Sequence, residues 1–460
     1  MSFDKCLALI FSLMILGQAY FVRRYVGTWL FPACLFGLFW FCLTFFPLIV
    51  LFNVPINPLG VGFILLCLAA FSSSALIFPW QERLKENILK RETTLLVFQN
   101  PFLKRTFYVL SSVTTLCIVL DSLAQGVSLH DLVYNLITTA ASYRNLVSFG
   151  DLNVTMYGRL GDILIYDVSI LGGMLISSTP TRWGRFRIIM CSFTPGVLMA
   201  VAQSTKWALF SSIAFFYGGV LTYQVAQSDF RLFKKGIFKK LILCFAILVL
   251  VTAVSFMSRG LQDSDDSTLI HDRLTLMFAS YSCGHLYAFS DWYGSYMAAN
   301  WDTGYQSQIR YQQDNATYGA TYGVYTFAPV ARFLGSTKAI PPDTFDDYYE
   351  YGNLIVSNIY TIFRGLIQDF GVGGCLLFMF LTGLLNHWSF NTMLRNRKPV
   401  LTVATFIFFI GFYYASFGRS LFSWSGIYFS FVVLCAILAI NKRLSLYPKE
   451  SASSFRTGSV

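Results

Sequence analysis

Long apolar runs constrain the fold of this chain more than any other feature of its sequence. Several runs approach the length of about 20 residues that an α-helix needs to cross a bilayer. Apolar residues make up 55% of the chain and charged residues only 12%, whereas a soluble domain carries about 25% charged residues. These features exclude an ordinary soluble domain, and we expect an all-α integral membrane protein.

Hydropathy predicts about eleven membrane spans, with roughly 10–14 compatible with the pattern. The expected spans cover 5–22, 28–52, 59–80, 106–124, 160–178, 188–205, 207–226, 241–257, 371–388, 400–417 and 421–440. The span over 160–178 is a weak prediction, because it holds Asp162 and Asp167.

The expected spans divide the chain into four regions. Residues 1–257 carry the first eight spans, with a periplasmic loop near 125–159. The others are a large periplasmic loop over 258–356, the C-terminal spans over 357–440 and a cytoplasmic tail over 441–460.

The distribution of basic residues predicts the orientation of these spans. Lys and Arg favour cytoplasmic loops, and most of the 34 basic residues fall on one side when Arg23 and Arg24 are placed inside. We therefore expect an N-terminus outside the membrane and a C-terminus in the cytoplasm. The net charge of +11 then reflects the membrane topology. The basic residues are scattered through short loops, which does not favour a nucleic-acid partner.

Cysteine and histidine give no sign of a metal site. The ten cysteines and four histidines show no CxxC or Cys/His spacing typical of metal ligands. We expect neither a metal nor another cofactor.

The large loop over 258–356 is rich in Tyr, Trp and Phe, which disordered segments lack. Residues 280–299 are predicted to form an amphipathic or re-entrant helix. Trp292, Trp301 and Asp291 suit two interpretations. They could form an aromatic belt at the lipid headgroups, or bind a sugar through stacked rings and hydrogen bonds to its hydroxyls.

Cations on the expected outer side run against the positive-inside pattern, so each is a candidate for function. Five of them stand out, namely Lys206, Arg259, Arg332, Arg364 and Arg419. The plain interpretation is that they are interfacial anchors or structural ion pairs. The alternative is that they bind a diphosphate, since arginine can hold phosphate oxygens through two parallel hydrogen bonds.

The stretch "SNIYTIFRGLIQDFGVGG", from Ser357 to Gly374, places polar residues beside an apolar run. A helix over 357–370 would bring Tyr360 and Arg364 onto one face. We expect the glycines that follow to let helices approach closely. Asp369 in this stretch, and His285 and Asp291 in the loop, are candidate general bases.

Three short motifs near the C-terminus resemble those of Wzy-type oligosaccharide repeat-unit polymerases. They are Tyr325-Thr326-Phe327-Ala328-Pro329, Asn358-Ile359-Tyr360-Thr361-Ile362-Phe363-Arg364 and Asp369-Phe370-Gly371. "QSTKWALF", with Lys206, is similar to the family's entry to a mid-chain span.

The resemblance implies a fold like the C type of membrane glycosyltransferases, working without metal or nucleotide sugar. It implies that a glycan linked to undecaprenyl diphosphate is transferred, at the periplasmic face, onto a second lipid-linked repeat unit. A flippase and a chain-length regulator of the same pathway would be its partners.

The resemblance, together with the outer cations and aromatic residues, implies roles for residues of this chain. Arg259 and Arg364 would bind the diphosphate, assisted by Lys206, Arg332 and Arg419. The expected sugar contacts are Tyr325, Tyr360, Trp292 and Trp301.

Two other functions share part of this pattern. A ligase of the O-antigen type would use the same donor but transfer finished chains to the lipid A core. A flippase or transporter of lipid-linked glycans would show inverted repeats and polar residues at the bilayer midplane, whereas polarity here gathers at the span ends.

Overall fold

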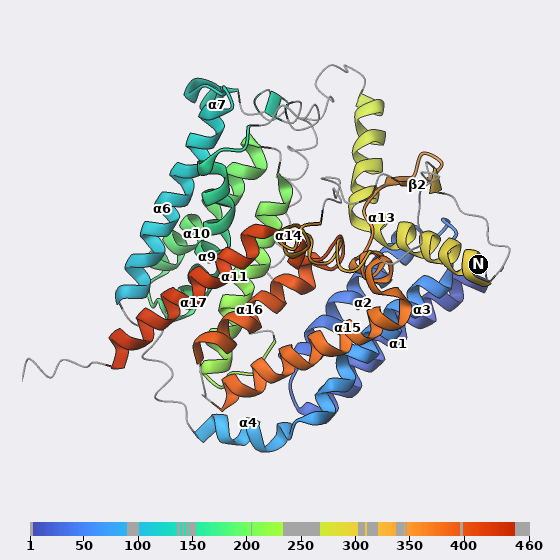
Figure 1. Cartoon of the computed structure of the whole chain (residues 1–460), viewed down its shortest axis with the longest axis horizontal. Helices are drawn as coiled ribbons and strands as arrows, with labels where there is room; N and C mark the ends of the chain where they lie inside the picture. The colour runs from blue at the N-terminus through green and yellow to red at the C-terminus, as the bar shows by residue number, and fades with distance from the viewer. Residues whose placement is uncertain are drawn as a thin grey trace, which may run out of the picture. The chain divides into compact units, whose positions relative to one another are not determined.

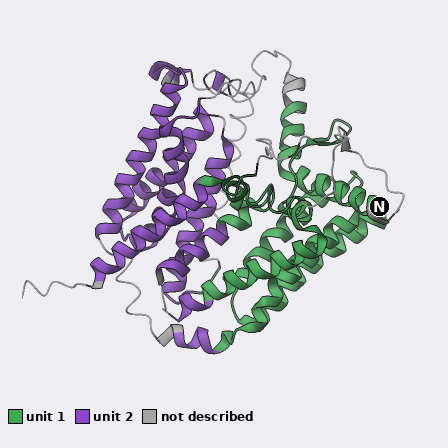
Figure 2. Cartoon of the chain, viewed as in Figure 1, with its two compact units in different colours: residues 1–81, 230–390, 411–425 green, residues 82–229, 391–410, 426–460 purple. Residues whose placement is uncertain are grey.

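The computed structural model describes most of the chain and divides it into two compact units. The described residues are 3–89, 101–135, 139, 142–143, 146, 153–203, 205–232, 267–301, 309–310, 321–336, 345, 347–395 and 399–446. Unit 1 comprises 1–81, 230–390 and 411–425, and unit 2 comprises 82–229, 391–410 and 426–460 (Figure 2).

Within the described residues, nine helices are long and apolar enough to cross a membrane. They are α1 (Phe3–Val26), α2 (Pro32–Val50), α3 (Pro58–Ser73) with η1 (Ser74–Ile77), α6 (Pro101–Ala124), α9 (Met156–Ser178), α10 (Arg182–Ala202), α11 (Lys206–Ala226), α15 (Ile362–Leu394) and α17 (Ser425–Leu446) (Figure 1). α16 (Pro399–Ala415) is apolar but shorter. These helices agree with a multi-pass helical membrane protein. The number eleven is not confirmed, and the expected span over 241–257 lies outside the described residues.

In unit 1, α1 packs against α2 and α3, and the long helix α13 (Ser267–Trp301) packs against α2 and α3. The approach of α13 to α3 is close, since a Cβ on Gly60 would lie 2.6 Å from the Cα of Ser290. The segment 280–299, expected as an amphipathic or re-entrant helix, thus belongs to a longer helix that covers two apolar ones.

Unit 1 also contains a small antiparallel sheet in the region expected to be a loop. Its strands are β1 (Ile309–Arg310), β2 (Tyr348–Tyr351) and β3 (Ile355–Ser357), in the order β1-β2-β3. Glu350 pairs with Val356, and Gly352 has the positive φ of 51° that such a turn favours. β3 packs against α13, so the sheet ties the end of the loop to the helical core.

α15 starts later than expected and is broken near its start. The strand β3 runs to Ser357, so the helix begins at Ile362, whose N–H donates to the carbonyl of Ser416 at 2.9 Å. Gly371 has φ 71° and ψ 177°, a conformation open almost only to glycine. The expected close approach occurs instead at Gly383, where a Cβ would lie 2.3 Å from the carbonyl oxygen of Phe71.

In unit 2, α9 lies among α6, α10 and α11 (Figure 1). The buried carboxylate of Asp121, near the end of α6, joins this helix to the residues that flank α9 and α10. It accepts hydrogen bonds from the Tyr143 hydroxyl at 3.3 Å, the Thr155 hydroxyl at 2.5 Å and the Gln203 amide at 3.0 Å. One carboxylate thus connects the region of the expected loop over 125–159 to the helix ends.

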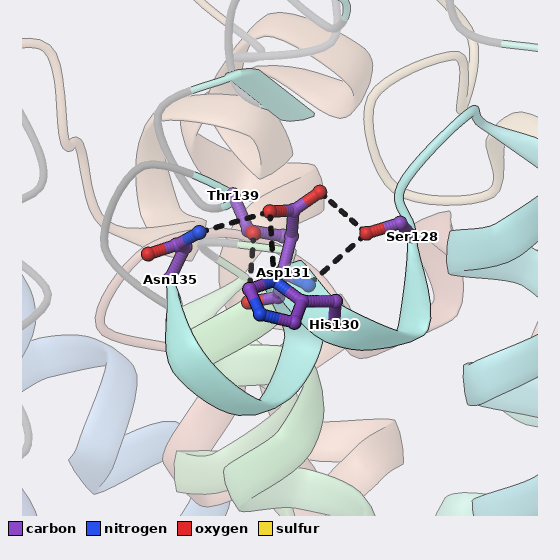
Figure 3. A network of polar contacts seen from close by, with 5 residues as sticks. All are labelled: Ser128, His130, Asp131, Asn135 and Thr139. Carbon is purple, nitrogen blue, oxygen red and sulfur yellow. Dashed lines mark hydrogen bonds and ion pairs between the residues drawn. The ribbon is translucent and has the colours of Figure 1, made fainter.

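The same loop region contains the short helix α7 (Leu129–Tyr134), and Figure 3 shows the polar contacts at its start. Ser128 caps the helix, since its hydroxyl accepts from the Asp131 N–H at 3.1 Å and donates to the Asp131 carboxylate at 2.6 Å. The Asn135 amide donates to that carboxylate at 3.0 Å. The hydrogen bonds from Ser128 and Asn135 lower the pKa of Asp131. This exposed network is a helix cap, which needs no ligand to explain it.

Candidate functional site

The strongest candidate site in unit 1 is built around Arg364, in the first turn of α15. Its side chain is buried, and its Cζ lies 4.0 Å from the ring centroid of Phe345, 4.1 Å from that of Tyr360 and 5.2 Å from that of Trp292 on α13. Aromatic faces attract a guanidinium, most strongly where water is excluded. Three rings from separate segments therefore form an aromatic box around one cation.

One carboxylate balances this cation. Arg364 Nη2 donates to Asp347 Oδ2 at 2.5 Å, just before β2 begins. Arg364 Nε and Nη1 are buried and have no hydrogen-bond partner among the residues that the structure describes. Buried N–H groups are normally paired, because an unpaired one loses its hydration without compensation. Arg364 therefore retains hydrogen-bonding capacity that a ligand with oxygen acceptors could use.

Asp369 organises the neighbouring segment. Its carboxylate accepts four hydrogen bonds from residues 321–326. The donors are the Thr321 hydroxyl at 2.5 Å, the Tyr325 N–H at 3.1 Å, and the Thr326 N–H and hydroxyl at 2.7 and 2.6 Å. Both carboxylate oxygens are occupied by these bonds. The geometry therefore indicates that Asp369, on α15, holds the segment with the Tyr-Thr-Phe motif against this helix.

A narrow cleft lies beside the aromatic box. Its lining includes Tyr325, Thr361, Arg419 and Phe345. The Phe345 ring stacks on Tyr325 with centroids 5.3 Å apart, so this ring contacts both the box and the cleft. The cleft has a volume of about 10 Å³, which is about the room that one water molecule needs. The Thr361 hydroxyl is buried and has no partner within the described parts of the chain.

Asp291 is a second buried carboxylate near the box. It stands on α13, one residue before Trp292. Burial raises the pKa of Tyr360, the charge of Arg364 and a hydrogen bond with its side chain oppose this rise, and the charges of Asp347 and Asp291 add to it. Asp291 therefore lies close enough to Tyr360 to act on it electrostatically.

His285 is buried in a packing contact between helices. Its Nε2 lies 3.1 Å from the carbonyl oxygen of Leu43, and its ring meets that of Phe417 edge-on at 5.9 Å. Burial lowers the pKa of His285 to about 4, partly offset by the hydrogen bond to Leu43, so the ring is neutral at pH 7. None of the contacts described for it involves Arg364.

The other predicted residues lie in varied positions. Arg419 packs over the ring of Trp424 at 4.3 Å, and Arg332 is exposed on the short helix α14 (Ala328–Phe333). Trp301 is the last residue of α13, and Lys206 is the first residue of α11 in unit 2. Arg259 lies outside the described residues.

Sequence reasoning missed two residues of the site, namely Phe345 of the aromatic box and Asp347, which pairs with Arg364. Both precede β2 in the run "DTFDDYYEY". Alternating aromatic residues followed by Gly-Asn are a hairpin signal, which could have placed the strands. No local signal shows which of several neighbouring carboxylates pairs with Arg364.

No family model, curated protein or solved structure matches this chain. In the described residues, no group of three or more His, Cys, Asp or Glu side chains is placed to hold a metal ion.

Proposed function

We propose that this protein polymerises oligosaccharide repeat units linked to undecaprenyl diphosphate, in the synthesis of a bacterial surface polysaccharide. The growing glycan moves from its lipid carrier onto a new lipid-linked unit at the periplasmic face, and undecaprenyl diphosphate leaves. The chain would be a metal-independent glycosyltransferase of the inner membrane, with a fold like the C type.

The buried guanidinium of Arg364 is the observation that carries this proposal. It combines a fixed positive charge, two nitrogens without an acceptor among the described residues and a wall of aromatic rings. Aromatic rings suit the C–H faces of sugars, and the guanidinium suits phosphate oxygens. Both kinds of group are needed where a sugar is bonded to a diphosphate.

The reaction transfers one glycosyl group. The acceptor hydroxyl oxygen forms a bond to the anomeric carbon, and the bond from that carbon to the phosphate oxygen breaks. The electron pair of the broken bond goes to the diphosphate, and the hydroxyl proton goes to a base. Negative charge grows on the leaving diphosphate, so the hydrogen bonds that Arg364 donates strengthen in the transition state.

We propose Asp291 as the proton acceptor because of its position. The described contacts of Asp369 hold residues 321–326, and those of His285 lie elsewhere in unit 1. Asp291 lies near Tyr360, which borders the aromatic box. Arg419 lines the adjacent cleft and would assist in binding phosphate.

Deletion of the gene in its host, followed by gel analysis of the surface polysaccharide, tests the proposal. Loss of a polymerase leaves the core with a single repeat unit, whereas loss of a ligase or flippase leaves the bare core. Complementation with Arg364→Ala should reproduce the single-unit pattern at wild-type protein levels. A bare core in the deletion strain, or a normal ladder with Arg364→Ala, would contradict the proposal.

A further inference from the structure

Unit 2 contains a large pocket that the proposed function does not use. It lies where α6 begins, α9 ends and α10 begins, and its volume is about 580 Å³. That volume falls in the range of about 300–1,000 Å³ typical of small-ligand sites. The side chains that line it include Lys104, Tyr108, Leu175, Thr181, Arg187 and Ile188.

The charge of this pocket is positive. Lys104 from α6 and Arg187 from α10 both line it. No Asp or Glu lines it within the part of the chain that the structure describes. Two cations that share a pocket with no lining carboxylate favour an anionic occupant.

The backbone at one wall adds to this preference. Thr181 caps α10 by accepting a hydrogen bond from the Gly184 N–H at 3.1 Å, and Arg185 Nε donates to the Thr179 carbonyl at 2.6 Å. The turn is tight, since a Cβ on Gly184 would lie 2.7 Å from both Thr179 Cγ2 and Thr181 Oγ1. The start of a helix of 21 residues thus forms part of the wall, and helix N-termini attract anions.

Neighbouring residues indicate a position at the lipid headgroups. Leu175 and Ile188 are buried and apolar, whereas Trp183 and Phe186, on the first turns of α10, are exposed and stack at 5.3 Å. Exposed aromatic rings near the end of a membrane helix are typical of the membrane–water interface. The pocket therefore offers cations beside an apolar interior at the level where a lipid headgroup meets its acyl chains.

We propose that this pocket binds the headgroup phosphate of an anionic phospholipid, with Lys104 and Arg187 contacting the phosphate. Basic pockets between membrane helices on the cytoplasmic side are suited to anionic headgroups. The sequence predicts that the loops before α6 and between α9 and α10 are cytoplasmic. The proposal uses only residues of unit 2 and is independent of the glycosyl transfer proposed above.

Native mass spectrometry of the purified full chain, titrated with phosphatidylglycerol, tests this site. The test variant is Lys104→Gln/Arg187→Gln. The matched control is Arg105→Gln/Arg182→Gln, which removes the same charge from the same two helices at residues that do not line the pocket. We expect the affinity of the test variant for the lipid to fall roughly 30-fold, since the phosphate loses its contacts with two cations. The affinity of the control should fall less than about twofold.

Two further arms identify the ligand and guard against misfolding. Phosphatidylcholine should bind at least about tenfold more weakly than phosphatidylglycerol, and Lys104→Arg/Arg187→Lys should retain binding because both charges remain. Equal loss in the test and control variants, equal binding of both lipids, or saturation of the pocket by inorganic phosphate without lipid would overturn the proposal.

Discussion

Two buried cations in unit 1, Lys5 and Arg364, use their hydrogen-bond donors in opposite ways. Lys5 Nζ, near the start of α1, donates to the carbonyls of Leu51 and Val54 at 2.8 and 3.0 Å and to the Tyr287 hydroxyl at 2.6 Å. Those bonds account for all three of its protons. Arg364, at the start of α15, has a partner for Nη2 but none among the described residues for Nε or Nη1.

The difference separates a structural cation from a candidate binding group. The side chains of both residues are almost completely buried, at 2% and 4% exposure, so burial and charge do not distinguish them. What distinguishes the two residues is the number of their donors that have an acceptor in the described protein. Lys5 joins α1 to the end of α2 and to α13, whereas Arg364 has donors that no described residue accepts.

The largest expected effect concerns activity and tests this distinction directly. Arg364→Lys keeps the charge but loses the planar array of donors, and we expect the polymerisation rate to fall about 10²–10³-fold. The measurement is the rate of chain growth from purified lipid-linked repeat units. Lys5→Met, compared per folded molecule, should retain the rate within about threefold, because no donor of Lys5 is left for a ligand. Comparable losses of rate in the two variants would break the comparison.

The next effect concerns stability and should appear at Lys5. Lys5→Met removes the donor to the Val54 carbonyl and to the Tyr287 hydroxyl, whereas the Leu51 carbonyl still accepts from the Tyr287 hydroxyl and the Val54 N–H. We expect the free energy of unfolding to fall by about 2–3 kcal/mol. Denaturant unfolding in detergent measures the change. Lys85→Met, at an exposed lysine, is the control and should change the free energy by less than about 0.5 kcal/mol. A small loss at Lys5 would show that it is not a structural cation.

Asp369 extends the comparison to a buried carboxylate whose hydrogen bonds are all internal. Asp369→Asn replaces one acceptor oxygen by an NH₂ group that faces two of the four donors, and it should lower the free energy of unfolding by about 2–3 kcal/mol. Asp131→Asn, in the exposed cap of Figure 3, is the matched control, and its loss of stability should be clearly smaller. Equal losses measured by the same unfolding experiment would argue against a positioning role for Asp369.

The smallest expected effect concerns the break in α15. Gly371→Ala places a side chain at φ 71°, and we expect a loss of about 1–2 kcal/mol. Gly373→Ala is the control, because its φ is not positive and a Cβ there would meet no other atom within 4 Å. It should be neutral or slightly stabilising, as judged by the thermal midpoint. A neutral Gly371→Ala would indicate that the helix can straighten without penalty.

Hydropathy was sufficient to predict the apolar helices, because a run such as 28–52 contains the signal for α2 within itself. It did not reveal that the segment 280–299 belongs to a helix of 35 residues, since the polar residues in α13 dilute its apolar pattern. Hydropathy also gave no sign of the break at Gly371, which depends on backbone dihedral angles.

The candidate site was predictable only in part, because some of its contacts join residues that are far apart in the sequence. The resemblance and the unusual position of a cation drew attention to Arg364, Tyr360 and Trp292, which the fold brings together. The pairing with Asp347 depends on a long-range contact that no spacing encodes. The sequence around Lys5 gives no sign of its structural role, because its hydrogen-bond partners after α2 and on α13 are distant in the sequence.

The pairing of Arg364 with Asp347 means that the site contains its own exchangeable counter-ion. An arriving phosphate would share the guanidinium with this carboxylate, and the two negative groups would repel each other. A diphosphate would therefore be held less tightly than by a lone arginine, and after bond cleavage Asp347 could compete for Arg364 and help to expel it. In the reaction that we propose, one lipid carrier leaves for every unit added, so such a built-in competitor would speed turnover.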